Sequence, residues 1–356
     1  MYSSDLQAGH LDHLSGGRAA WNVVTSSDAF TGENFRRGGF LPQDQRYERA
    51  RTFLETTWEL FDSWRGDEIV ADKETGVFLA DPHPGRFAHH DAHFDIEGQF
   101  NVPRSPQVRP VIFQAGDSDE GREFAASSAD AIFTRHSTLV AGQAFYADLK
   151  GRLAKYGRSH DQILILPAAT FVLGDTDAEA AELAREVRRQ QVSGQTAIKL
   201  LEQVWNRDLS DHDPDGPLPS IDPNPGENTV SLGRAAVRRH RDPIAIAHEW
   251  RAKAEAEGLT TRELIIAVTG RQAFVGTPAT VAQSINDFVQ QDASDGFIMV
   301  PHITPGGLAP FVDKVVPLLQ ERGVFRTDYA GTTLRDHLGL ATPTAREPAV
   351  AAQDAS

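Results

Sequence analysis

The feature that most constrains this chain is a regular alternation of short apolar runs with longer segments of helical period. The apolar runs lie at 21–25, 110–114, 131–133, 163–173 and 296–300, and each reads as a buried strand. Segments of helical character lie at 46–64, 120–128, 139–156, 176–191, 281–289 and 309–319. Strands that alternate with helices predict an α/β fold with a parallel sheet covered by helices, because a parallel sheet is buried on both faces.

Two segments interrupt this rhythm. The segment 67–105 is rich in Gly, Pro and His, and it predicts a loop with a hairpin. The segment 193–258 is longer and more polar, and such excursions from a compact α/β domain are usually lids or binding loops. We therefore expect a single domain over 1–340 that carries both insertions. The small and polar residues of 341–356 predict a disordered tail.

Composition excludes several classes of function. The 356 residues carry a formal net charge of −15, which disfavours electrostatic binding to nucleic acid or to an anionic membrane. The chain has no cysteine, so disulfides, thiolate catalysis and cysteine-ligated metal centres are excluded. No apolar run approaches the roughly 20 residues that cross a bilayer, and residues 1–13 show no secretory signal. We expect a cytoplasmic enzyme that binds neither nucleic acid nor membrane.

Several short motifs stand in a fixed order along the chain. They are Asp12-His13-Leu14-Ser15-Gly16-Gly17-Arg18, Trp21-Asn22-Val23-Val24-Thr25, Gln45-Arg46-Tyr47-Glu48, Asn101-Val102-Pro103-Arg104, Gln114-Ala115-Gly116-Asp117-Ser118 and Gly121-Arg122-Glu123-Phe124-Ala125. Each motif alone is weak. The ordered set, at these spacings, resembles the nitrilotriacetate and dibenzothiophene-sulfone monooxygenase family of the luciferase-like superfamily. The resemblance runs from about Leu11 to Leu340 and covers nearly all of the chain.

The resemblance implies a TIM-type (β/α)8 barrel that binds reduced FMN at the carboxyl ends of its strands. It implies the oxygenase component of a two-component system, in which a separate flavin reductase supplies reduced FMN. Such an enzyme inserts one oxygen atom from O2 into a small organic substrate. The flavin reacts with the oxygen, while the protein binds the flavin and positions the substrate. The catalytic residues and the substrate stay open. The resemblance also suggests a homo-oligomer, either a dimer or a tetramer.

Two flavin contacts of the family have counterparts here. Tyr47 matches a tyrosine that reaches the flavin phosphate region, and Ser118 matches a serine of the phosphate site. Gly116 permits a tight backbone turn, and the helix that follows Ser118 presents free N–H groups to an anion. The acidic residues Asp117 and Asp119 beside this turn would repel a phosphate.

Two further residues are weaker candidates for flavin binding. Gln43 stands where the family usually has a histidine, and glutamine donates a hydrogen bond but carries no charge. Asn22 lies inside an apolar strand and calls for a polar partner, which flavin or substrate at the barrel mouth would supply. Structural interpretations stand beside these functional ones: Ser118 as a helix cap, Tyr47 as a core tyrosine and Asn22 in a buried hydrogen bond.

Histidines gather in the first insertion. They are His83, His89, His90 and His93, interspersed with Asp91 and Asp95. This spacing could suit a metal, but histidine is also common in polar loops, and we expect no metal site. His136 follows the strand at 131–133, where it faces either the barrel mouth or the surface.

The chain also departs from the family at its start. In the family an opening stretch with the first three strands precedes the motif at Asp12, and residues 1–9 are too short to supply it. The expected fold is therefore an incomplete barrel that lacks about three strands. A fragment or misplaced start, which we favour, a degenerate copy, or completion by another chain would each explain this. The alternative function is a non-catalytic fragment or partner subunit that no longer binds flavin.

Overall fold

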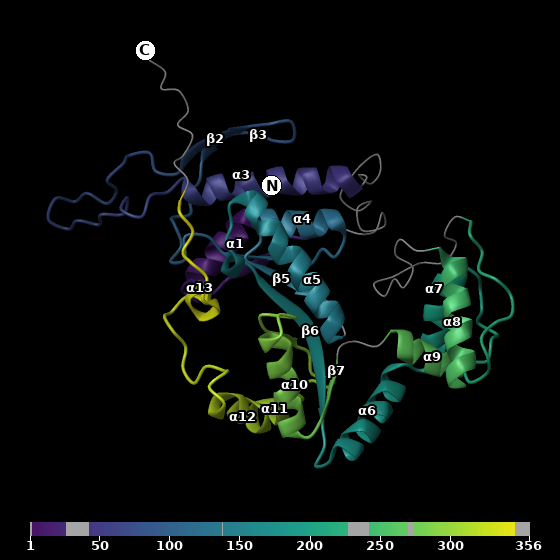
Figure 1. Cartoon of the computed structure of the whole chain (residues 1–356). Coiled ribbons are helices and arrows are strands. Elements are labelled where there is room, and N and C mark those ends of the chain that lie inside the picture. Colours follow the sequence, from purple (N-terminus) through teal and green to yellow (C-terminus); the bar gives the residue numbers. More distant parts are fainter. Residues whose placement is uncertain (1, 26–42, 137, 227–241, 270–272, 346–356) are drawn as a thin grey trace. The chain divides into compact units, whose positions relative to one another are not determined.

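The computed structural model describes residues 2–25, 43–136, 138–226, 242–269 and 273–345. The chain divides into two compact units, which are described separately (Figure 1). The first unit consists of Met1–Ala168, Asn286–Ile298 and Arg322–Ser356, and the second of Ala169–Ile285 and Met299–Glu321. Strand β6 (Leu164–Leu173) contributes its first half to one unit and its second half to the other.

A parallel sheet forms the centre of the first unit. Its strands pair in the order β1 (Ala20–Asn22), β4 (Val111–Gln114), β5 (Ala131–Thr134) and the first half of β6. The helices of this unit are α1 (Tyr2–Ser15), α3 (Gln43–Asp62), α4 (Asp119–Ser128), α5 (Leu139–Arg152) and α13 (Leu334–Leu338), with short 3-10 turns at η1 (Leu153–Tyr156) and η2 (His160–Gln162). The predicted parallel sheet with helices packed on it is confirmed.

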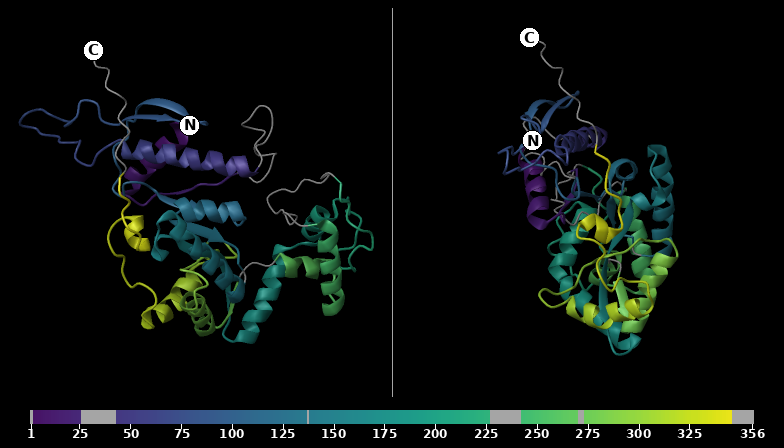
Figure 2. Two further views of the ribbon diagram at one scale, coloured as in Figure 1. Left: turned by 45° about the horizontal axis from the view of Figure 1, so that its top comes forward. Right: turned by 90° about the vertical axis from the view of Figure 1, so that its left-hand side faces the viewer.

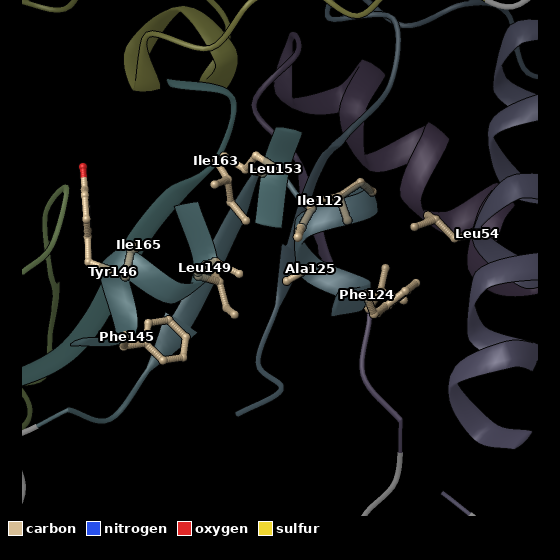
Figure 3. Close-up of a cluster of buried hydrophobic side chains, with 14 residues drawn as sticks. Leu54, Ile112, Phe124, Ala125, Phe145, Tyr146, Leu149, Leu153, Ile163 and Ile165 are labelled. Atoms are coloured by element: carbon tan, nitrogen blue, oxygen red, sulfur yellow. The ribbon is translucent and has the colours of Figure 1, made fainter. Parts of the chain in front are cut away.

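Alternation along the strands gives this sheet a face that packs against the helices. Ile112, Ile132 and Ile165 lie on that face and are almost completely buried. They meet Leu54 of α3, together with Phe124 of α4 and Leu149 of α5. Figure 3 shows the side chains of this core between the strands and the helices. Each such side chain contributes about 1.5–3 kcal/mol when fully buried, so this core holds the carboxyl ends of β4 and β5 in place.

The hairpin predicted within 67–105 is confirmed. Strands β2 (Arg86–His90) and β3 (Asp95–Gln99) pair in antiparallel fashion, and the hairpin lies along α3 (Figure 2). Phe87 and Phe100 pack with Phe61 and Trp64 of the α3 region. The Trp64 indole N–H donates to the Phe100 carbonyl at 2.7 Å, which fastens the hairpin to the helix.

In the second unit, the second half of β6 pairs with β7 (Ala273–Gly276), a strand that the sequence did not predict. Strand β8 (Ile298–Met299) also pairs with β6. The helices are α6 (Asp177–Gln191), α7 (Gly194–Trp205), α8 (Pro243–Glu257), α9 (Thr261–Val268), α11 (Ala309–Lys314) and α12 (Val316–Glu321). Helix α10 (Pro278–Gln290) begins in this unit, and its residues from Asn286 onward belong to the first unit. The helix predicted at 309–319 is therefore two short helices that meet at Val315.

The described part of the second insertion, 193–258, is more ordered than its polarity suggests. Its helices α7 and α8 pack with α9, which follows the insertion, around the buried side chains of Leu201, Trp205, Trp250 and Leu264. A function as a lid stays a prediction. Within the described ranges, no helix combines the length and the apolar character that crossing a membrane requires.

Candidate functional site at the carboxyl ends of β4 and β5

Polar side chains gather in the first unit where β4 and β5 end. Gln114 ends β4 and is 2% exposed, and Thr134 ends β5 and is 4% exposed. The carboxyl ends of parallel strands carry the chemistry in TIM-type barrels. Neither residue was predicted as a site residue. The sequence does contain a signal for them, because each is a polar residue at the last position of an apolar strand.

Ser118 caps the helix that follows β4. Its extended backbone (φ −70°, ψ 166°) places it at the N-cap of α4, and its Oγ accepts a hydrogen bond from the Gly121 N–H at 3.1 Å. The hydroxyl keeps its own hydrogen, so Ser118 can still donate to a ligand. The N–H groups of the first helical turn attract anions. The structural and the functional interpretation of Ser118 are therefore compatible.

Tyr47 reaches the same turn from α3. A Cβ atom added to Gly116 or to Gly121 would lie 2.9 Å from the Tyr47 hydroxyl oxygen, and each added Cβ would lie 2.8 Å from the Cα of the other glycine. Only glycine fits such close contacts. The Tyr47 ring also packs against Phe124, with ring centroids 6.0 Å apart. The structure thus brings Tyr47 and the turn of Ser118 together, and flavin binding by these two residues stays a prediction.

The acidic residues beside this turn are paired with arginines. Arg122 lies with one guanidinium nitrogen 3.4 Å from Asp117 Oδ1 and with another 2.9 Å from Asp148 Oδ2. Arg152 lies 2.6 Å from Asp119 Oδ1. Although burial opposes the shift, hydrogen bonds from Arg122 and Arg152 lower the pKa of Asp148. These ion pairs offset the repulsion that Asp117 and Asp119 would exert on a phosphate.

His136 lies in the loop between β5 and α5. Its ring packs against Phe145 of α5, with centroids 4.3 Å apart, and the Arg122 guanidinium stands 5.0 Å from the centre of the same Phe145 ring. Burial lowers the pKa of His136, with Asp117 raising it and Arg122 lowering it further. Of the two predicted placements, the structure therefore favours the first: His136 is half-buried near the carboxyl end of β5.

The two weaker candidates have different outcomes. Asn22 is the last residue of β1, and its side chain is exposed. The expectation of a buried asparagine is wrong, because the side chain lies on the face of β1 that the described residues leave open, beside its register partner Phe113. Gln43 is the first residue of α3, and its side chain lies outside the described part of the chain. Binding of flavin by either residue stays a prediction.

The histidines of the hairpin bind carboxylates. His89 places Nδ1 2.7 Å from Glu59 Oε2 and Nε2 2.8 Å from Asp91 Oδ2. Although burial opposes the shift, these two carboxylates raise the pKa of His89. His90 lies 2.6 Å from Asp95. Among the described residues, no group of three suitable side chains could hold a metal ion.

A sequence profile described as luciferase-like monooxygenase matches residues 6–295. The chain belongs to the luciferase-like monooxygenase family. It is 39% identical to N-acetyl-S-(2-succino)cysteine monooxygenase of Bacillus subtilis (strain 168), over 96% of this chain and 75% of that protein. It is 38% identical to nitrilotriacetate monooxygenase component A of Aminobacter aminovorans, over 94% of this chain and 71% of that protein.

A solved structure of riboflavin lyase with modified FMN and riboflavin is also similar to this chain. The TM-score is 0.74 at 29% identity, and the alignment covers 97% of this chain and 73% of the lyase. The predicted family and the TIM-barrel-type fold of luciferase-like monooxygenases are confirmed. The enzyme class that the sequence predicted, a flavin-dependent monooxygenase, is confirmed with them.

Proposed function

We propose that this chain is the oxygenase component of a two-component system. It takes reduced FMN from a separate flavin reductase and inserts one oxygen atom from O2 into a small organic substrate. The name of one relative, component A of a monooxygenase, supports a second component. The solved lyase with modified FMN supports FMN as the flavin.

The observation that carries the proposal is the glycine-lined turn at the start of α4. Gly116 and Gly121 leave room there for the Tyr47 hydroxyl, and Ser118 stands between them in sequence as the helix cap. A hydroxyl pair beside a helix N-terminus is suited to a phosphate monoester. The residues present therefore fit the phosphate end of FMN.

In this arrangement the protein holds and orients the cofactor. Ser118 would donate its hydroxyl hydrogen to the phosphate while Oγ still accepts from the Gly121 N–H, and Tyr47 would donate from its hydroxyl beside Gly116 and Gly121. Arg122 keeps Asp117 neutralised during binding. When bound, reduced FMN supplies the reaction with molecular oxygen.

The test is an anaerobic titration of the purified chain with reduced FMN, in which calorimetry measures the binding. We expect saturable binding, and we expect Ser118→Ala to weaken it by about tenfold or more, since a hydrogen bond to a charged group is worth about 1.5–3 kcal/mol. Ser193→Ala is the matched control. Ser193 caps α7 through a hydrogen bond of 3.1 Å from the Thr196 N–H, the same length as in the Ser118 cap.

Equal weakening by both serine substitutions would show that loss of a helix cap, and not loss of a phosphate contact, explains the result. No saturable binding by the unsubstituted chain would overturn the proposal. It would favour the alternative, a chain that keeps the scaffold without flavin. The predicted assembly into dimers or tetramers stays a prediction that sedimentation velocity would test.

A further inference from the structure

Two buried polar atoms near the end of β5 lack a hydrogen-bond partner in the part of the chain that the structure describes. Thr134 Oγ1 and His136 Nε2 have no hydrogen-bond partner among the described residues. Buried polar groups in folded proteins are nearly always hydrogen-bonded, and an exception calls for a reason, such as a ligand. Thr134 is the last residue of β5, and His136 lies in the connection between β5 and α5.

His136 stands beside the first turn of α4. Phe145 contacts both His136 and Arg122, at 4.3 Å between the two ring centroids and at 5.0 Å from the guanidinium carbon. Arg122 in turn donates to the Asp117 carbonyl at 3.2 Å, and Asp117 directly precedes Ser118. A short chain of contacts therefore connects His136 to the candidate phosphate site.

The charges around the turn leave a phosphate in need of a further donor. Arg122 is shared between Asp117 and Asp148, and Arg152 is occupied by Asp119 and Asp148. These four ion pairs occupy both guanidinium groups of the turn with carboxylates of the protein. His136 is the titratable side chain at this edge whose Nε2 atom is buried without a partner among the described residues.

We infer that His136 is a phosphate-contacting residue of this chain, which donates a hydrogen bond from Nε2 to the phosphate of bound FMN. The inference rests on the proposed function, because it assigns a further residue to that same site. Contact with the phosphate gives the orphaned Nε2 atom its partner. Phe145 holds the imidazole ring in position for that contact.

The test compares FMN with riboflavin, which lacks the phosphate, both in reduced form and under anaerobic conditions. His136→Phe keeps an aromatic ring against Phe145 but removes both ring nitrogens. We expect it to weaken FMN binding by about tenfold and to leave riboflavin binding unchanged. His136→Gln keeps an amide donor and should restore part of the FMN affinity.

His160→Phe is the matched control. The His160 ring packs against Tyr146 of the same helix, α5, with centroids 5.5 Å apart, and His160 precedes β6 instead of following β5. Its substitution should leave the ratio of FMN to riboflavin affinity unchanged. A second measurement needs no substitution: the ring 15N signals of His136 should shift on addition of FMN but not of riboflavin.

The outcomes separate the inference from the proposed function. If the unsubstituted chain binds FMN while His136→Phe changes neither affinity, or changes both equally, the assignment of His136 is wrong and the proposed function stands. If the unsubstituted chain binds no FMN, both are overturned. If His136→Phe does not fold, His136→Gln and the 15N signals of the unsubstituted chain are the test. Ring 15N signals of His136 that do not change on addition of FMN would show that the assignment is wrong.

Discussion

Gln107 donates a hydrogen bond from Nε2 to Asp12 Oδ1 at 2.7 Å, across a separation of 95 residues. Both side chains are buried. Asp12 Oδ1 also accepts from the Ala19 N–H at 3.0 Å, and Gln107 Nε2 also donates to the Ala19 carbonyl at 2.7 Å. Two segments that are distant in sequence therefore meet around Ala19, directly before β1.

Gln107→Leu should destabilise the first unit. The substitution removes both bonds and leaves the Asp12 carboxylate and the Ala19 carbonyl buried with fewer partners. We expect a loss of about 2–4 kcal/mol, since each unsatisfied buried group costs about 1–3 kcal/mol. The urea midpoint measures the loss. Gln99→Leu is the control, because exposed Gln99 makes one such bond, to the Pro84 carbonyl at 2.7 Å; similar losses for both would contradict the prediction.

Gly116→Ala should disrupt the candidate site. The new Cβ would lie 2.8 Å from the Gly121 Cα atom and 2.9 Å from the Tyr47 hydroxyl oxygen, and the backbone of α4 cannot yield without losing its cap. We expect FMN affinity to fall by about tenfold or more, in line with a strain of about 1–3 kcal/mol. Calorimetric titration measures the change.

The control for this clash is Gly151→Ala. A Cβ at Gly151, within α5, meets nothing within 4 Å. Alanine is favoured over glycine inside a helix by about 1 kcal/mol, so this variant should be slightly more stable and should bind FMN normally. Equal behaviour of the two variants would show that the turn tolerates a side chain.

Much of the fold follows from the sequence because its signals are local. The ten apolar-rich residues of β6 and the hydroxyl cap of α6 at Thr176, which accepts from the Glu179 N–H, define those elements without help from the rest of the chain. Helix α1 was not predicted, because apolar residues such as Leu11 and Leu14 are exposed and form no buried stripe. Strand β7 was also missed, since four residues that end in a glycine give little pattern to read.

The candidate site was predictable only in part. The family resemblance identified Tyr47 and Ser118, and the structure brings them to one turn. The partners of Arg122 depend on how α4 packs against α5, and no local pattern reports that packing. The burial of Asn22 was misjudged for the same reason: an apolar strand is buried only where other elements lie over the face in question.

Tyr47→Phe should separate binding from packing. The ring keeps its contact with Phe124, while the hydroxyl beside Gly116 and Gly121 is lost. We expect a weakening of FMN binding by a factor of about 3 to 30, with a change in stability under about 1 kcal/mol. Riboflavin affinity should stay constant. A parallel fall in riboflavin affinity would place the Tyr47 hydroxyl away from the phosphate.

His89 should make the stability of the hairpin depend on pH. Its folded-state pKa is raised by Asp91 and Glu59 against the opposing effect of burial. A raised pKa means that the stabilisation is fully present below the unfolded value of about 6.5 and is lost as pH rises through the folded value. The urea midpoint should therefore fall as the pH rises above about 6.5.

His89→Asn should flatten this pH profile, because asparagine cannot become cationic between Glu59 and Asp91. His302→Asn, at an exposed position, is the control and should keep the unsubstituted profile. An unchanged slope in His89→Asn would assign the pH dependence to other groups.

Asp295 should be required for stability at the start of β6. Its carboxylate accepts from the Tyr146 hydroxyl at 3.0 Å and from the Ile165 N–H at 2.8 Å, and it lies 3.1 Å from the Lys150 ammonium group. Lys150 is buried and also donates to two backbone carbonyls. Burial and Asp295 raise the pKa of Tyr146, which keeps that hydroxyl protonated as a donor.

Lys150→Met should cost about 3–5 kcal/mol, the range for breaking a buried ion pair by removing one partner. The double substitution Lys150→Met with Asp295→Asn should be less destabilising than the sum of the single ones. Each single substitution leaves the other charge without its partner, whereas the double variant removes both charges. Lys155→Met is the control: Lys155 pairs with Glu123 at the surface, where solvent screens such a pair and its contribution to stability is small. Additive losses in the double variant would mean that Lys150 and Asp295 stabilise β6 independently, through the backbone groups that each one bonds.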